Sequence, residues 1–243
     1  MQDARRPMSL PWITASSAFP PLTSALHAPN GLLAAGAELS ADLLLRAYRH
    51  GIFPWYGPGQ PVLWWSPDPR MVLMVDAFRL RRSLAKVVRN GGFEVRADTA
   101  FAAVMRACAE VPRPGQDGTW ITPEIIAAYC ALHARGLAHS VEAWRGGALV
   151  GGLYGVGIGR MFFGESMFAR ERDASKVALA HLVAMLRVRG FPMIDCQQET
   201  SHLASFGARP MPRREFAECV ARLVDSPAPQ GPWEALAVEE VLA

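Results

Sequence analysis

The chain has few of the features that mark a secreted or membrane protein. Only four cysteines occur among its 243 residues, and no two of them form a CxxC pair. This argues against a disulfide framework and a cysteine zinc site. No apolar run approaches the roughly 20 residues of a membrane helix, and no apolar segment follows Arg5 and Arg6 as in a signal peptide. We therefore expect a cytoplasmic protein without membrane contact.

Several catalytic motifs are also missing. The sequence has no Walker phosphate loop, no GxSxG elbow, and no cluster of His, Cys and carboxylate residues with metal-ligand spacing. Cys196 is a candidate nucleophile, but alternation along an extended strand turns it away from Asp195 and Gln197. We expect no metal and no cofactor, so any reaction would use a substrate that arrives already activated.

The composition is that of an ordinary globular protein. Hydrophobic residues make up 51% and charged residues 19%, and the formal net charge is +3. A chain of this length suits one large domain or two unequal ones. Because the net charge is small, attraction to nucleic acid would need a local basic patch.

Patterns of both helix and strand predict an α+β fold in two parts. Pro67-Asp68-Pro69 is the clearest boundary. We therefore predict a small N-terminal domain over residues 1–68 and a larger domain over 69–243. The proline-rich sequence from about residue 226 resembles a tail or tether.

One predicted helix, near residues 80–90, carries a basic face. Arg79, Arg82, Lys86 and Arg89 follow helical spacing, and no acidic residue lies between Asp76 and Glu94. This face is a candidate contact for phosphate groups of a nucleic acid. An ordinary solvated helix face is the other interpretation, and the sequence leaves both open.

The stretch from Phe191 to Gln197 predicts a buried strand that ends in polar residues. In an extended strand, Asp195 and Gln197 share one face. A carboxylate and a carboxamide at a buried position are costly unless partners satisfy both. Glu165, among apolar residues of another predicted strand, needs a partner for the same reason. These residues are either functional or structural.

Seven sequence blocks together carry a family resemblance. They occur in the order that is typical of bacterial leucyl/phenylalanyl-tRNA–protein transferases, and they span nearly all of residues 10–225. They are Gly51-Ile-Phe-Pro-Trp-Tyr56, Trp64-Trp-Ser-Pro-Asp-Pro-Arg70, Gly151-Gly-Leu-Tyr-Gly155, Gly164-Glu-Ser-Met-Phe168, Ala174-Ser-Lys176, Ile194-Asp-Cys-Gln197 and His202-Leu-Ala-Ser-Phe-Gly-Ala208.

The resemblance implies a fold and an activity. The larger domain should resemble the Gcn5-related N-acyltransferase fold. The activity should be transfer of Leu, Phe or, less well, Met from aminoacyl-tRNA to the α-amine of a protein that begins with Arg or Lys. The product would carry an N-end-rule degradation signal. Such an enzyme needs no cofactor, and we expect a monomer.

The resemblance also implies roles for single residues. Gln197 would contact the attacking amine, Asp195 would carry the charge in a proton relay, and Glu165 would position the aminoacyl group or the acceptor. Leu153, Phe162 and Ile194 would line the side-chain pocket, and Tyr48, Trp55 and Trp120 would lie where the terminal adenosine stacks. Leu153 stands where relatives often carry methionine, which leaves the ranking of Leu, Phe and Met open. The basic face, Arg79, Arg82, Lys86 and Arg89, would hold the acceptor stem through its phosphates.

Two other functions fit parts of the sequence. An acetyl-CoA-dependent N-acetyltransferase shares the expected fold, but it needs a glycine-containing pyrophosphate loop where this chain has Arg170-Glu-Arg-Asp-Ala-Ser175. A non-catalytic RNA-binding protein would use the basic face and the aromatic residues, but would leave Asp195, Gln197 and Glu165 without a role.

Overall fold

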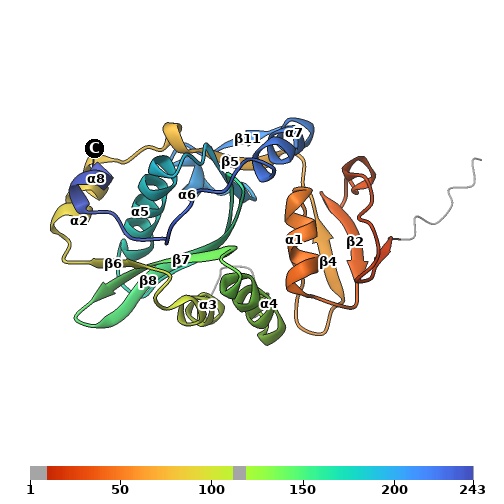
Figure 1. The fold of residues 1–243 in the computed structure, drawn as a ribbon, viewed down its shortest axis with the longest axis horizontal. Helices are drawn as coiled ribbons and strands as arrows, with labels where there is room; N and C mark the ends of the chain where they lie inside the picture. Colours follow the sequence, from red (N-terminus) through yellow and green to blue (C-terminus); the bar gives the residue numbers. More distant parts are fainter. Residues whose placement is uncertain (1–9, 112–118, 243) are drawn as a thin grey trace, which may run out of the picture.

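The small N-terminal part of the molecule is a four-stranded sheet with one α-helix packed beside it (Figure 1). The computed structural model describes residues 10–111 and 119–242. The strand order is β1-β2-β4-β3. The elements are β1 (Trp12–Ile13), β2 (Leu32–Gly36), α1 (Ala41–Arg49), β3 (Phe53–Pro54) and β4 (Val62–Trp65).

The larger part is built on a seven-stranded sheet in the order β11-β5-β10-β9-β8-β7-β6. β9 and β10 pair in parallel and are connected by helix α5 (Ala174–Val188). The strands are β5 (Arg70–Met74), β6 (Glu94–Ala97), β7 (Ala138–Arg145), β8 (Ala148–Ile158), β9 (Met161–Ala169), β10 (Met193–Gln197) and β11 (Arg209–Met211). Two sheets combined with helices confirm the α+β class.

Side chains that alternate along β8 and β9 build a core on each face of the large sheet. Tyr154 and Phe163 pack with α3 (Phe101–Glu110) and α4 (Pro123–Ala134). Leu153 and Phe162, their neighbours in sequence, point to the opposite face and pack with α5. Helices α2 (Arg82–Asn90) and α8 (Val238–Leu242) lie on the α5 side.

Capping residues recognisable in the sequence begin two of these helices. The Ser40 hydroxyl accepts a hydrogen bond from the backbone of Leu43 at the start of α1. The Thr122 hydroxyl does the same for Ile125 at the start of α4, with Pro123 in the first helical position. Each bond satisfies a backbone N–H group that the helix itself leaves unpaired.

The two sheets meet at a junction formed largely by α1. The chain leaves the small sheet at Trp65 and enters the large one at Arg70. Helix α1 packs against α4 and against α7 (Arg213–Val224). Side chains from α1 and the small sheet therefore reach the large sheet. Tyr48 contacts Phe163 of β9, and Phe53 packs on Arg70 of β5.

The proline-rich segment that we expected to be a tail or tether is packed against the large domain. The Arg189 guanidinium donates to the backbone carbonyls of Pro229, Gly231 and Pro232. The Trp233 ring stacks on His139, and α8 then packs against α2 and α5. In residues 10–111 and 119–242, no helix has the length and apolar character needed to cross a bilayer.

Candidate active site

A cavity of about 390 Å³ opens between the large sheet, α5 and the small domain. Its inner wall is apolar, formed by Leu73, Leu153, Met167, Leu179, Leu182 and Ile194. Phe53, Trp55 and Trp120 lie on the side of the small domain, and Glu165, Asp195, Gln197, Thr200 and His202 supply polar groups. An apolar cavity with a few converging polar groups is the usual form of a small-ligand site.

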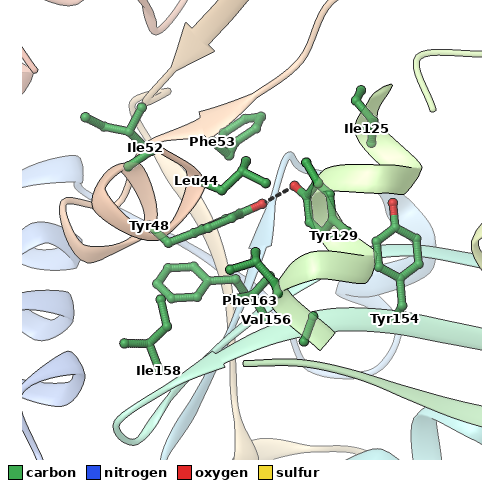
Figure 2. Packing of buried hydrophobic residues seen from close by; sticks show 14 of the residues in the cluster. Leu44, Tyr48, Ile52, Phe53, Ile125, Tyr129, Tyr154, Val156, Ile158 and Phe163 are labelled. Carbon is green, nitrogen blue, oxygen red and sulfur yellow. Dashed lines mark hydrogen bonds between the residues drawn. The ribbon is translucent and has the colours of Figure 1, made fainter. Parts of the chain in front are cut away.

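Glu165 lines the cavity and accepts three hydrogen bonds from side chains. One carboxylate oxygen accepts hydrogen bonds from the Tyr48 hydroxyl (2.6 Å) and the Gln197 carboxamide nitrogen (3.0 Å), and the other accepts from the Tyr129 hydroxyl (3.0 Å). Figure 2 shows the two tyrosine hydroxyls, from α1 and α4, directed at one another across the domain junction. Burial raises the pKa of Glu165 to about 7, although the bonds from both tyrosines act in the opposite direction.

Gln197 reaches Glu165 because the strand bends at this point. The pairing of β10 with β5 shifts register between Asp195 and Gln197, and Gln197 has a φ of 62°. Its side chain thus leaves the regular alternation of the strand. Since the carboxamide nitrogen donates to Glu165, the carboxamide oxygen remains as the acceptor.

Asp195 is held by a different set of partners. Both carboxylate oxygens are bound by the Arg70 guanidinium, at 2.8 and 2.7 Å, and both side chains are fully buried. Asp195 also accepts the backbone N–H of Gln197 at 2.9 Å. The Arg70 guanidinium lies over the rings of Phe53 and Phe216, 4.6 Å from each centroid. Gln197 thus contacts Asp195 through its backbone and Glu165 through its carboxamide. The expected contact of Gln197 with the attacking amine and the charge-bearing role of Asp195 stay predictions.

Cys196 also lines the cavity, and it packs with Ile194 on the side of β10 opposite to Asp195. The Gln197 carboxamide instead reaches Glu165, which is also bound by Tyr48 and Tyr129. Burial raises the pKa of the Cys196 thiol far above its usual range, followed in importance by the nearby charge of Asp195. The thiol is therefore protonated near neutral pH and is a poor nucleophile.

Of the six predicted substrate-binding residues, four line the cavity: Leu153, Ile194, Trp55 and Trp120. Tyr48 and Phe162 are fully buried and lie outside the lining. The Tyr48 hydroxyl is bound to Glu165, so its ring is not open for stacking on a base. Phe162 pairs with Ile194 across β9 and β10 and lies behind the wall that Ile194 forms.

The basic face is smaller than its spacing suggested. Arg82, Lys86 and Arg89 lie on α2 and are exposed, but Arg79 precedes the helix. The backbone N–H of Arg79 donates to the carbonyl of Phe206, just after the short helix α6 (Ser201–Ala204). Arg79 is thus anchored beside α6, whose His202 lines the cavity.

Sequence reasoning missed the roles of two residues. Tyr129, on the apolar face of its helix, was assigned no role, and Arg70 stood only as the last residue of a motif. Tyr129 was recognisable as the member of that face with a hydroxyl to satisfy. Arg70 carried no local signal, because its partner Asp195 is 125 positions away.

Comparison with known proteins gives a consistent result over most of the chain. Residues 72–221 match the family model for leucyl/phenylalanyl-tRNA protein transferase, and residues 37–68 match the model for its N-terminal domain. The chain belongs to this family. Such a transferase from Chromobacterium violaceum is 56% identical over 93% of this chain and 96% of its own length. One from Thiobacillus denitrificans is 61% identical over 90% of this chain and 96% of its own.

Similarity to solved structures is much weaker. L-PGS from Bacillus licheniformis gives a TM-score of 0.38 at 10% identity, over 77% of this chain and 64% of the other. A match at this level carries no argument about fold or activity. Family membership makes the chain a transferase that uses aminoacyl-tRNA and a protein acceptor.

Proposed function

We propose that this transferase moves Leu, Phe or, less well, Met from aminoacyl-tRNA to the α-amine of proteins that begin with Arg or Lys. The product would carry an N-end-rule degradation signal. The observation that supports this best is the cavity itself, an apolar space with Glu165 and Gln197 together in its lining. An apolar amino-acid side chain fills the space, and the ester lies against the polar pair.

The apolar wall accounts for the choice of aminoacyl groups. Six aliphatic or thioether side chains line it, so a polar side chain would lose its hydrogen bonds to water there without replacement. Apolar side chains that differ by one methylene are separated by only about 1–3 kcal/mol in such a pocket. Relaxed acceptance of Leu, Phe and Met follows from this.

The polar pair accounts for the chemistry. The acceptor amine attacks the ester carbonyl, a C–N bond forms, and the bond from that carbon to the terminal ribose oxygen breaks. The Gln197 carboxamide oxygen accepts a hydrogen bond from the amine and orients it. Glu165 takes the proton that the amine loses, which suits a carboxylate whose pKa is about 7. The same proton then goes to the departing ribose oxygen.

In this proposal Asp195 is a positioning residue. Its carboxylate is shared between Arg70 and the backbone N–H of Gln197. It therefore holds Gln197 in the bent conformation that directs the carboxamide to Glu165. This differs from the proton relay that the family resemblance implied, in which Asp195 carried the charge.

The tRNA would approach along the rim that joins the cavity to α2. Trp55 and Trp120 line the cavity and offer rings to the terminal adenosine, and stacking of this kind contributes about 1–3 kcal/mol per base. Arg82, Lys86 and Arg89 would bind acceptor-stem phosphates without reading sequence. The parallel β9-α5-β10 unit supports an acyltransferase-like fold of the Gcn5-related kind. Cytoplasmic location and a monomeric state stay predictions.

Transfer of labelled leucine tests the proposal. We expect the purified protein to move radiolabelled leucine from Leu-tRNA to a peptide that begins with Arg. A peptide with acetylated Arg at its first position, which lacks the attacking amine, should stay unlabelled. A parallel reaction with acetyl-CoA should give no product. Acetylation of the peptide, or tRNA binding without any transfer, would overturn the proposal.

A further inference from the structure

The C-terminal strap, residues 226–242, packs Trp233 against the core between the large sheet and α5, which also forms the inner wall of the cavity. The Trp233 ring stacks on His139 with centroids 3.9 Å apart and an interplanar angle of 16°. The Trp233 and Phe191 ring centroids are 5.9 Å apart, and the Arg189 guanidinium lies 4.9 Å from the Trp233 centroid. The Arg189 guanidinium also donates to three backbone carbonyls just before Trp233. The stack on His139 and these backbone bonds together hold the Trp233 ring in place.

Phe162 lies between Trp233 and the cavity. The Phe162 and Trp233 ring centroids are 5.8 Å apart. Phe162 on β9 also pairs with Ile194 on β10, and Ile194 lines the cavity. The Phe162 ring rests on Gly155, where an added Cβ would come within 2.6 Å of it. Trp233 lies over Gly157 with more room, since an added Cβ there would meet its ring at 3.6 Å, an ordinary van der Waals contact.

These residues form one row along one face of β8. Leu153, Gly155 and Gly157 are every second residue of β8, so they lie on the same face of the strand. Leu153 lines the cavity, Phe162 covers Gly155, and Trp233 covers Gly157 and His139. Gly155 gives the Phe162 ring room against the sheet, and Trp233 occupies the space into which Phe162 would otherwise move.

We propose that Trp233 is a positioning residue for substrate specificity, which holds Phe162 in place behind Ile194, a wall residue of the aminoacyl side-chain pocket. This inference rests on the proposed transfer activity. Protein interiors are close-packed, so a ring without its neighbour relaxes toward the space that opens. Without Trp233, Phe162 moves away from Ile194, the pocket deepens, and larger side chains fit.

Relative transfer of large and small aminoacyl groups tests this. For the wild type and Trp233→Ala, kcat/KM is measured with Leu-tRNA, Phe-tRNA and Trp-tRNA and one peptide that begins with Arg. We expect the Phe/Leu and Trp/Leu ratios to rise about tenfold, the lower end of what a small change in an apolar pocket produces. The body of each tRNA is the same for both proteins, so its contribution cancels.

Three further variants separate positioning from general damage. Trp233→Phe keeps a ring over Gly157 and should stay near the wild-type ratios. Phe162→Leu shortens the side chain behind Ile194 without changing the strap, and it should raise the ratios as Trp233→Ala does. Trp12→Ala removes an exposed tryptophan of the small sheet and should change neither ratio.

The failures are distinguishable. Wild-type protein that transfers no aminoacyl group overturns the proposed function and this inference with it. Active wild-type protein whose ratios are unchanged in Trp233→Ala overturns the inference alone. If Trp233→Ala does not fold, unchanged ratios in Phe162→Leu overturn it in the same way.

Discussion

Glu165 and Asp195 are carboxylates of one cavity, but their partners give them different properties. Asp195 has a guanidinium on both of its oxygens, whereas Glu165 is bound by two hydroxyls and a carboxamide, all of them neutral. Desolvation of the Glu165 carboxylate at this partly buried position, with no cation among its hydrogen-bond partners, raises its pKa. We therefore assign proton transfer to Glu165 and positioning to Asp195.

The raised pKa of Glu165 predicts how stability depends on pH. The pKa is about 7 in the folded protein against an ordinary value of 4.5, so the folded state binds more protons than the unfolded state between these values. The contribution of Glu165 is complete below pH 4.5 and is lost as pH rises through 7. Urea unfolding at several pH values should show a loss on the order of 3 kcal/mol that Glu165→Gln lacks. An identical pH dependence in that variant would contradict the assigned pKa.

The Arg70–Asp195 pair predicts a stability effect at two positions. Arg70→Met leaves the Asp195 carboxylate buried without its cation, which should lower the free energy of unfolding by about 3–5 kcal/mol. Adding Asp195→Leu to Arg70→Met removes the buried charge, so the double variant should regain much of that stability. Urea denaturation measures both variants. A double variant as unstable as the single one would show that packing of Arg70 on Phe53 and Phe216, rather than charge, is decisive.

At the scale of elements, α2 offers a prediction about tRNA. Arg82→Glu with Lys86→Glu should weaken tRNA binding and make it less sensitive to salt, by about 0.9 in the logarithmic slope for each phosphate that the variant no longer neutralises. Arg106→Glu is a matched control, because Arg106 is exposed on α3, which packs on the opposite face of the sheet. Filter binding of Leu-tRNA across a salt series gives the slopes. Unchanged affinity and slope would remove α2 from the tRNA path.

Most helices and strands could be predicted from neighbouring residues, whereas contacts between distant parts of the chain could not. The caps at Ser40 and Thr122 and the apolar runs of β8 to β10 follow from neighbouring residues. In the site, Glu165 and Gln197 stood out as polar residues in apolar strands. The bend at Gln197 and the pairing of Asp195 with Arg70 depend on strands that meet only after folding. Helical spacing included Arg79 because it does not show where α2 begins.

At the scale of the whole molecule, both sheets contribute to one site. Tyr48 from α1 binds Glu165, and Phe53 from the small sheet covers Arg70. Trp55 completes the cavity from the same side. In the proposed mechanism, proton transfer therefore depends on the junction between the domains as well as on the strands that carry Glu165 and Gln197.

The rate of leucine transfer as a function of pH, in the wild type and in Glu165→Gln, tests the central claim most directly. The acceptor amine must lose a proton, with an ordinary pKa of about 7.7–8.0, and Glu165 must be ionised, with a pKa of about 7. Below both values the logarithm of the wild-type kcat/KM should rise with a slope near two, following the two ionisations.

In Glu165→Gln the slope should fall to about one, and the rate should drop about 10²–10⁴-fold while Leu-tRNA affinity is retained. Wild-type turnover with an unchanged slope in that variant would contradict the account and show that a group other than Glu165 takes the proton.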